Sequence, residues 1–214
     1  MCGRFWLGAN IEDILRKYRI RNQEVNKYTK GEFYPSSNIP IIFENEERTL
    51  KLAKWGFPFD GRKGAVINAR AESIKHKPMF RNSFYSTRCI IPANMFYEWK
   101  DEGNKQKNKY SIGLKDEDLF SLGGIYKLSL DENSNQQLTV VIITTESAGE
   151  MKDIHSRMPL IIKDDKMDLW LNRNSSINHI EEILISNNKN KLVIERCEVE
   201  KSKDADIEKY EQLS

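Results

Sequence analysis

Cys2 follows Met1, so removal of that methionine would make Cys2 the first residue of the chain. A small second residue such as cysteine normally permits this trimming. The product is a 1,2-aminothiol, whose α-amine titrates near ~8 and whose thiol titrates near ~8.5, so both are partly nucleophilic at neutral pH. An aldehyde can then be captured twice, first as an imine on the amine and then as a thiazolidine closed by the thiol. The alternative is a small residue that merely begins a strand.

A second group of polar residues lies in the segment INARAES at residues 67–73. Asn68 could position a reacting carbonyl or hold the N-terminus, and Arg70 could hold a phosphate. In the alternative interpretation, Asn68 forms an Asx-turn and Arg70 pairs with Glu72.

A carboxyl group stands among aromatic residues in the segment RCIIPANMFYEWK at residues 88–100. If Tyr97 and Trp99 face one side of a strand, Glu98 faces the other. Partial desolvation there would raise the pKa of Glu98 toward values useful in acid–base catalysis, although Glu98 could equally face solvent. Cys89 lies in an apolar run and is interpreted as inert core.

The segment IHSRMP at residues 154–159 places an imidazole two residues before an arginine. Histidine is the side chain best suited to proton transfer at neutral pH, so His155 is a candidate acid–base group. His76 and His179 lack such a setting and are assigned structural roles.

The segment KWGFPF at residues 54–59 offers aromatic faces beside a glycine and a cation. Such platforms can stack nucleobases at ~1–3 kcal/mol per base, so Trp55 is a candidate nucleic-acid contact. The alternative is aromatic core at the end of a hairpin.

Short strand-like runs separated by polar turns must position these residues. They predict one α+β domain over residues 1–214, built on a curved, mostly antiparallel sheet with a few peripheral helices. Residues 201–214 are polar and predicted to fray. The expected strands cover residues 39–43, 49–57, 88–91, 95–100, 110–114, 119–130, 138–145 and 191–199, and the expected helices a segment capped by Asn10 and residues 164–171 and 177–185.

Composition narrows the class of protein further. The net charge of +2 does not by itself indicate a nucleic-acid binder, so any DNA-binding face must come from local clusters of Arg and Lys. The odd set Cys2, Cys89 and Cys197, without a signal peptide or long apolar run, favours free thiols in the cytoplasm and no membrane contact. The absence of a CxxC motif or a His/Cys cluster argues against a zinc site.

Taken together, these segments resemble the SOS response-associated peptidase (SRAP) family, the abasic-site processing proteins. The resemblance runs from Cys2 to about Ile162 and rests on MCGRF, WG, NARAE, FR, RCIIPA, FYEW and HSRMP in that order. It implies an α+β domain around a β-barrel-like core with a positively charged cleft. It also implies covalent capture of abasic sites in single-stranded DNA, without a metal or organic cofactor, by a protein we expect to be a cytoplasmic monomer that joins the nucleoid when bound to DNA.

The resemblance also implies roles for individual residues. Cys2 is the nucleophile, Asn68 and Glu98 are its partners, and His155 transfers protons. Met1 is expected to be removed, and self-cleavage is one route for its removal. The residues matching phosphate-holding positions are Arg4, Arg70, Arg81 and Arg157, and Trp55 matches a base-stacking position.

Some positions depart from the family pattern. Asn94 and Met95 replace a more familiar Asp-Gly, and Phe57 replaces a leucine. Residues 196–206 do not match the expected ending. Two other functions are considered: a cysteine peptidase with Cys2 as nucleophile and His155 as base, and a non-catalytic module that binds single-stranded nucleic acid through Trp55 and the arginines.

Overall fold

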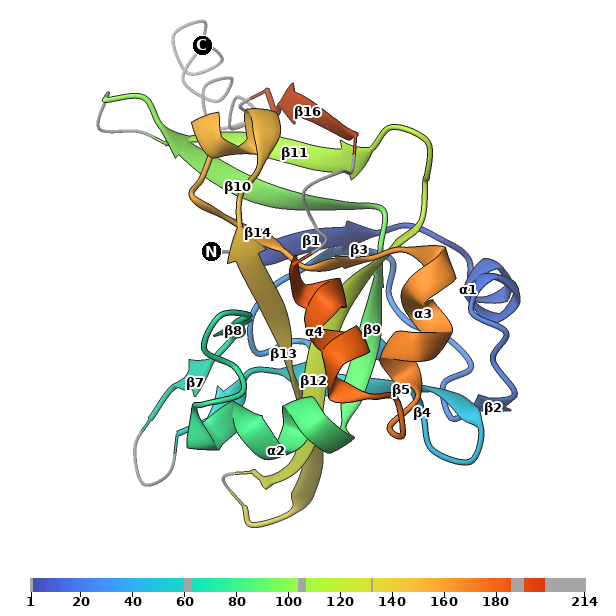
Figure 1. Cartoon of the computed structure of the whole chain (residues 1–214). Coiled ribbons are helices and arrows are strands. Elements are labelled where there is room, and N and C mark those ends of the chain that lie inside the picture. Colours follow the sequence, from blue (N-terminus) through green and yellow to red (C-terminus); the bar gives the residue numbers. More distant parts are fainter. Residues whose placement is uncertain (1, 60–62, 104–106, 132, 186–190, 199–214) are drawn as a thin grey trace, which may run out of the picture.

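Long strands with buried apolar residues form a closed circuit around the core (Figure 1). The computed structural model describes residues 2–59, 63–103, 107–131, 133–185 and 191–198. The circuit consists of five strands, because β5 pairs in parallel with β13 and so closes the antiparallel run β13-β12-β9-β4-β5. Their bounds are β4 (Asn38–Glu44), β5 (Arg48–Trp55), β9 (Arg88–Ala93), β12 (Phe120–Leu130) and β13 (Gln136–Glu146).

Shorter strands extend this barrel. Two of them pair with β13: β8 in parallel, and β14 antiparallel. Both carry candidate site residues, so β13 is the strand that brings them together. The short strands are β2 (Asn22–Gln23), β6 (Phe57–Pro58), β7 (Ala65–Val66), β8 (Asn68–Arg70), β14 (Arg157–Pro159) and β15 (Ile161–Ile162).

A second sheet of five strands lies above the barrel in Figure 1, in the order β16-β11-β10-β1-β3. Only Asn94 separates β9 of the barrel from β10 of this sheet. The Asn94 side chain accepts a hydrogen bond from the Gly8 amide at 2.7 Å and donates one to the Asp118 carbonyl, so it satisfies backbone groups where the chain passes between sheets. The strands are β1 (Arg4–Leu7), β3 (Gly31–Phe33), β10 (Met95–Asp101), β11 (Lys107–Leu114) and β16 (Leu192–Arg196).

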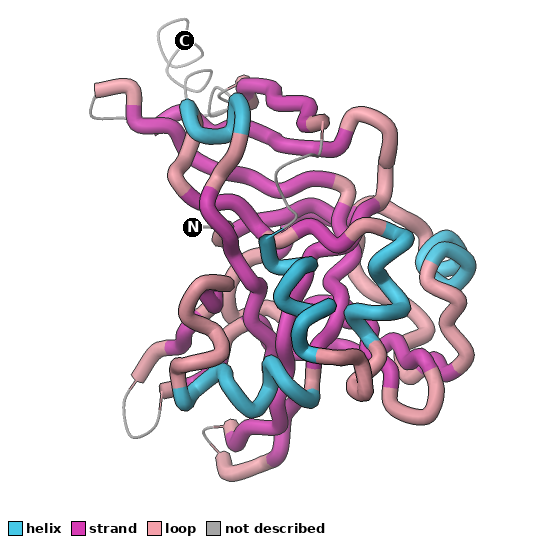
Figure 2. The backbone as a smooth tube through the Cα atoms, in the orientation of Figure 1, coloured by secondary structure: helices cyan, strands magenta, loops and turns pink. Residues whose placement is uncertain are grey.

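The helices lie on the outside of the strand scaffold (Figure 2). Helices α3 and α4 have the predicted bounds, and α1 begins after Asn10 as expected. Asn10, however, makes no side-chain capping bond, and the residue before α3 is Lys163 rather than an aspartate. The helices are α1 (Ile11–Lys17), α2 (Pro78–Ser86), α3 (Asp164–Leu171), α4 (Ile177–Ile185) and the 3₁₀ helix η1 (Gly149–Asp153).

The predicted α+β class and barrel-like sheet are confirmed, with local differences. The strand expected to run to Phe57 ends at Trp55 because Gly56 adopts φ +133°, and a Cβ there would lie 2.9 Å from the Cβ of Ala65. The strand expected over 191–199 is observed as β16, and Val199 lies outside the described residues, as does the tail 201–214.

Candidate active site

Cys2 lies two residues before the start of β1 and has no exposed surface. Its thiol contacts the Arg4 carbonyl oxygen at 3.9 Å. Burial raises the pKa of the Cys2 thiol well above its ordinary value, and the nearby Glu98 carboxylate raises it further. The sequence-based expectation of a partly ionised thiol at neutral pH is therefore wrong for this folded state, because desolvation disfavours the thiolate.

Asn68 holds the backbone of Cys2 from the neighbouring strand β8. Its Nδ2 donates a hydrogen bond to the Cys2 carbonyl oxygen at 3.1 Å, so the side chain makes a long-range contact rather than an Asx-turn. Asn68 is 8% exposed, and within the described part of the chain its Oδ1 has no hydrogen-bond partner. The amide thus offers a buried acceptor beside the N-terminal residue.

Glu98 projects from β10 into the interior and is 2% exposed. The alternation predicted for this strand is found: Glu98 is buried, whereas Trp99 is half-buried and lies 5.6 Å from the Arg4 guanidinium on the outer side. Burial raises the pKa of Glu98, and the His155 imidazole partly offsets that effect. The solvent-facing alternative is excluded by this burial.

His155 follows η1 and is held by backbone groups. Its amide donates to the Met151 carbonyl at 3.0 Å, and the Arg157 amide donates to Nδ1 at 2.9 Å. The Arg157 carbonyl oxygen lies 3.1 Å from the same Nδ1, so the backbone of Arg157 holds the ring through both its amide and its carbonyl. His155 interacts electrostatically with Glu98, and Glu98 with Cys2, so these three residues form one cluster with Asn68.

Arg4 lies at the edge of this cluster, on the outer face of the five-stranded sheet. Its guanidinium stacks 5.2 Å from the Tyr34 ring and 5.6 Å from the Trp99 ring, and it forms an ion pair with Glu32 at 3.1 Å. The Arg4 side chain is 39% exposed, so a solvent anion can reach it.

Arg70 and Arg81 are exposed, on β8 and α2 respectively. The alternative in which Arg70 forms an ion pair with Glu72 is not found: Glu72 instead accepts two hydrogen bonds from Arg157, at 2.9 and 3.0 Å. Arg157 was expected to be free to bind a phosphate, but its guanidinium is already paired with the Glu72 carboxylate and its side chain is only 11% exposed.

Trp55 is not a surface platform. It has no exposed surface, its ring lies 5.6 Å from that of Phe5, and its Nε1 donates to the Ile67 carbonyl at 3.0 Å. The prediction that Trp55 stacks a nucleobase is wrong for this conformation, and the core interpretation holds. Exposed aromatic surface is supplied instead by Trp6 and Tyr34, at 37% and 48% exposure; alternation along β1 could have indicated Trp6, whereas Tyr34 follows β3.

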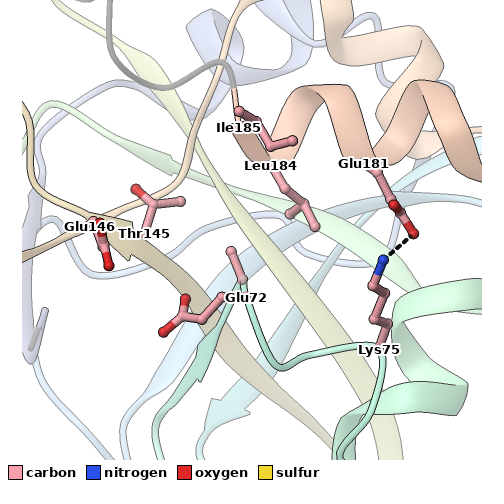
Figure 3. A pocket seen from close by; sticks show the side chains of 8 residues that line it. Glu72, Lys75, Thr145, Glu146, Glu181, Leu184 and Ile185 are labelled. Carbon is pink, nitrogen blue, oxygen red and sulfur yellow. Dashed lines mark hydrogen bonds and ion pairs between the residues drawn. The ribbon is translucent and has the colours of Figure 1, made fainter.

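A pocket of about 320 Å³ is lined on one side by Glu72 (Figure 3). Its walls combine the end of β13, the turn after β8 and the last turn of α4. Across the pocket from Glu72, Lys75 and Glu181 form an ion pair at 2.9 Å. The lining residues are Ala71, Glu72, Lys75, Thr145, Glu146, Glu181, Leu184 and Ile185.

Neither a metal cluster nor a membrane span is found in the residues that the structure describes. No group of three or more His, Cys, Asp or Glu side chains there is arranged to hold a metal ion. No helix in those ranges is long and apolar enough to cross a membrane. The three cysteines are free thiols, with Cys2 and Cys89 buried.

The fold and the cluster define a β-barrel protein whose buried N-terminal cysteine is surrounded by an amide, a carboxyl and an imidazole. The chain belongs to the SOS response associated peptidase (SRAP) family, whose sequence model matches residues 1–202. The abasic site processing protein YoaM of Bacillus subtilis (strain 168) is 39% identical over 198 residues, which cover 86% of this chain and 86% of that protein.

More distant relatives also match most of the chain. The abasic site processing protein YedK of Escherichia coli (strain K12) is 27% identical over 196 residues, covering 87% of this chain and 86% of that protein. A crystal structure of a protein from Bacteroides thetaiotaomicron superposes with a TM-score of 0.80 at 27% identity, covering 92% of both chains.

Proposed function

We propose that this protein captures abasic sites in single-stranded DNA as a covalent adduct of Cys2. The observation that carries the proposal is the hydrogen bond from buried Asn68 to the Cys2 carbonyl, beside the buried carboxyl of Glu98. This arrangement fixes an N-terminal residue next to a proton-transfer group. The names of the relatives, which process abasic sites, support the same conclusion.

Removal of Met1 is the first requirement, because it turns an amide nitrogen into a nucleophilic amine. The opened abasic deoxyribose presents an aldehyde, and the Cys2 amine adds to it to form a carbinolamine. Glu98 then gives a proton to the departing hydroxyl, which leaves as water. The raised pKa of Glu98 suits this acid role, because burial favours the protonated carboxyl.

The thiol closes the ring in the second step. The Cys2 sulfur attacks the imine carbon, and its proton passes to the Glu98 carboxylate left by the first step. Aldehyde and aminothiol thus give a thiazolidine and one water. The raised pKa of the buried thiol means that a base must take its proton at the moment of attack, and Glu98 is the nearby carboxylate.

Asn68 and His155 have separate tasks in this mechanism. Asn68 holds the Cys2 carbonyl at 3.1 Å, which orients the amine, and its unpartnered Oδ1 can accept a hydrogen bond from the reacting nitrogen. His155 is assigned to release, meaning ring opening or strand-cleaving elimination, because both need proton transfer on the sugar. Loss of His155 should slow release more than capture.

The DNA backbone is assigned to the arginines at the surface. Among these arginines, Arg4, Arg70 and Arg81 are accessible to solvent. Arg157 can bind a phosphate only when its guanidinium is released from the ion pair with Glu72. Trp6 and Tyr34 provide aromatic faces beside Arg4 for neighbouring bases. Such contacts give binding that weakens with salt.

The experiment that tests the proposal compares oligonucleotides with and without one abasic site. We expect a heat-stable protein–DNA band on a denaturing gel only with the abasic single strand. A version with an uncleavable residue before Cys2 should give no band because its amine is blocked. A band from that version would contradict the role of the amine.

The two other functions make different predictions in the same experiment. A cysteine peptidase needs an accessible thiolate, whereas burial raises the pKa of the Cys2 thiol, which disfavours that function. A simple binding module would retain intact single strands reversibly and would tolerate Cys2→Ala.

A further inference from the structure

Glu72 clamps the guanidinium of Arg157 from the turn after β8. Nη1 and Nη2 of Arg157 donate to the two carboxylate oxygens at 2.9 and 3.0 Å, and Nη2 also donates to the Thr144 carbonyl at 2.6 Å. Glu72 is the more exposed partner, with its side chain 52% exposed against 11% for Arg157. The arginine is thus fixed between a strand carbonyl and a surface carboxylate.

The backbone of the same arginine holds His155. The Arg157 amide lies 2.9 Å from Nδ1 of His155 and donates to it when the ring proton is on Nε2, whereas in the other tautomer Nδ1 would donate to the Arg157 carbonyl oxygen at 3.1 Å. Arg157 is the first residue of β14, a strand of only three residues, so little strand pairing secures it. The side-chain clamp therefore restrains the peptide that orients the imidazole.

One short segment consequently reaches both sides of the cluster. Asn68 bonds to the Cys2 carbonyl, and Glu72, four residues later, bonds to Arg157. Thr144 ties the two ends together, because it stands opposite Arg70 in the pairing of β8 with β13 and also accepts from Arg157. The distance between Cys2 and the His155 imidazole therefore depends on the segment from Asn68 to Glu72.

We propose that Glu72 is a positioning residue which, through Arg157, keeps Nδ1 of His155 an acceptor and holds the ring beside Glu98. This inference rests on the proposed function, since it assigns Glu72 to the step performed by His155. Burial of Glu72 would raise its pKa, but the hydrogen bonds from Arg157 outweigh that and lower it, so the clamp is ionised at neutral pH.

The test compares Glu72→Ala and Glu72→Gln with the control Glu181→Gln. Glu181 lines the same pocket but pairs with Lys75, so its substitution changes a nearby carboxylate without touching Arg157 (Figure 3). Imidazole ¹⁵N chemical shifts of His155, measured without DNA, report which ring nitrogen carries the proton. Rates of capture and release on an abasic oligonucleotide are measured on the same proteins.

We expect Glu72→Ala to move the ¹⁵N shifts toward a tautomer mixture and to slow release roughly ten- to a hundred-fold, as for a misplaced catalytic group. Glu72→Gln should lie between the wild type and Glu72→Ala, since Gln keeps one acceptor for Arg157. Capture should change little, and Glu181→Gln should match the wild type.

Unchanged ¹⁵N shifts in both Glu72 variants would overturn the inference. Equal losses of capture and release, with a lower melting temperature, would also overturn it, because they indicate a role in folding alone. If the wild type forms no adduct, the proposed function fails, yet the ¹⁵N measurement still decides whether Glu72 positions His155.

Discussion

At the scale of single residues, the environment of Cys2 gives its thiol and its α-amine different reactivities. Burial and Glu98 raise the pKa of the thiol, so the thiol stays protonated until a base accepts its proton. In the proposed mechanism, the amine created by loss of Met1 is therefore the group that reacts first. This order makes sulfur essential for a lasting adduct but not for the first bond.

Cys2→Ser tests that division directly. The variant keeps an α-amine after Met1 removal but cannot close a sulfur ring, so only a hydrolysable imine should form. We expect no heat-stable adduct without a reductant, and trapping of the imine by borohydride. A heat-stable adduct from fully processed Cys2→Ser would contradict the thiazolidine step.

Glu98→Gln should separate binding from chemistry. Gln keeps the shape but loses the titratable proton, so crosslinking should slow by about 10²–10⁴-fold, as for a lost general acid–base, while affinity for abasic strands persists. N-terminal mass is the control, because a variant that retains Met1 would be inactive for another reason. Normal crosslinking by processed Glu98→Gln would assign the role to another group.

The same variant gives a pH signature in stability. The pKa of Glu98 is raised in the folded state above 4.5, so its stabilising contribution is complete below that value and is lost as the pH rises through the folded pKa. Glu98→Gln cannot ionise. Its free energy of unfolding should therefore increase relative to the wild type as the pH rises through that interval, by at most ~1.4 kcal/mol per pH unit. Urea unfolding at several pH values measures this difference.

At the scale of elements, β13 and its neighbours determine where the site residues meet. β8 and β14 both pair with β13, so Asn68 on β8 and Arg157 on β14 lie beside the same barrel strand. The Arg157 backbone in turn holds His155, which 86 intervening residues separate from Asn68 along the chain. The barrel is in turn braced by helices whose ends are held by a buried cation, Arg88.

Arg88 is 4% exposed and its donors all go to main-chain carbonyls at helix ends. We expect Arg88→Met to lower the free energy of unfolding by on the order of 3 kcal/mol, because it leaves buried acceptors unsatisfied. Arg81→Met, on the exposed side of α2, should change it by less than about 0.5 kcal/mol. Equal effects in chemical denaturation would contradict this role. The carbonyls are those of Phe84, Tyr85, Trp170 and Asn172.

Much of the fold is predictable from local pattern, whereas long-range partners are not. Apolar runs separated by polar turns indicated the strands β12 and β13, and Glu98 was correctly expected to face away from Trp99. Helix α2 was missed because it begins at Pro78 without a clear apolar stripe. Spacing alone could not reveal that Glu72 pairs with Arg157 or that Trp55 is buried, since both depend on how distant strands pack.

At the scale of the whole molecule, exposed cations must supply the DNA-binding face because the net charge is only +2. Strand β8, which ends at Arg70, and helix α1, which ends two residues before Arg19, lie on opposite sides of the view in Figure 1. We therefore expect DNA phosphates to bind on the side of the protein that carries Arg70.

Arg70→Ala should weaken binding to intact and abasic single strands alike and reduce the salt slope by about 0.7 per lost phosphate contact. Arg19→Ala is the matched control, because it removes an exposed arginine that pairs with Asp168 instead. Fluorescence anisotropy at several salt concentrations measures both. Identical slopes for the two variants would make Arg70 a structural residue.

The central claim is tested most directly by intact mass spectrometry of the wild-type protein after incubation with a single-stranded abasic oligonucleotide. The account predicts one species with the mass of the chain without Met1 plus the oligonucleotide minus one water, stable to heat without a reductant. An unmodified chain, or an adduct that retains Met1, would contradict capture by the Cys2 aminothiol.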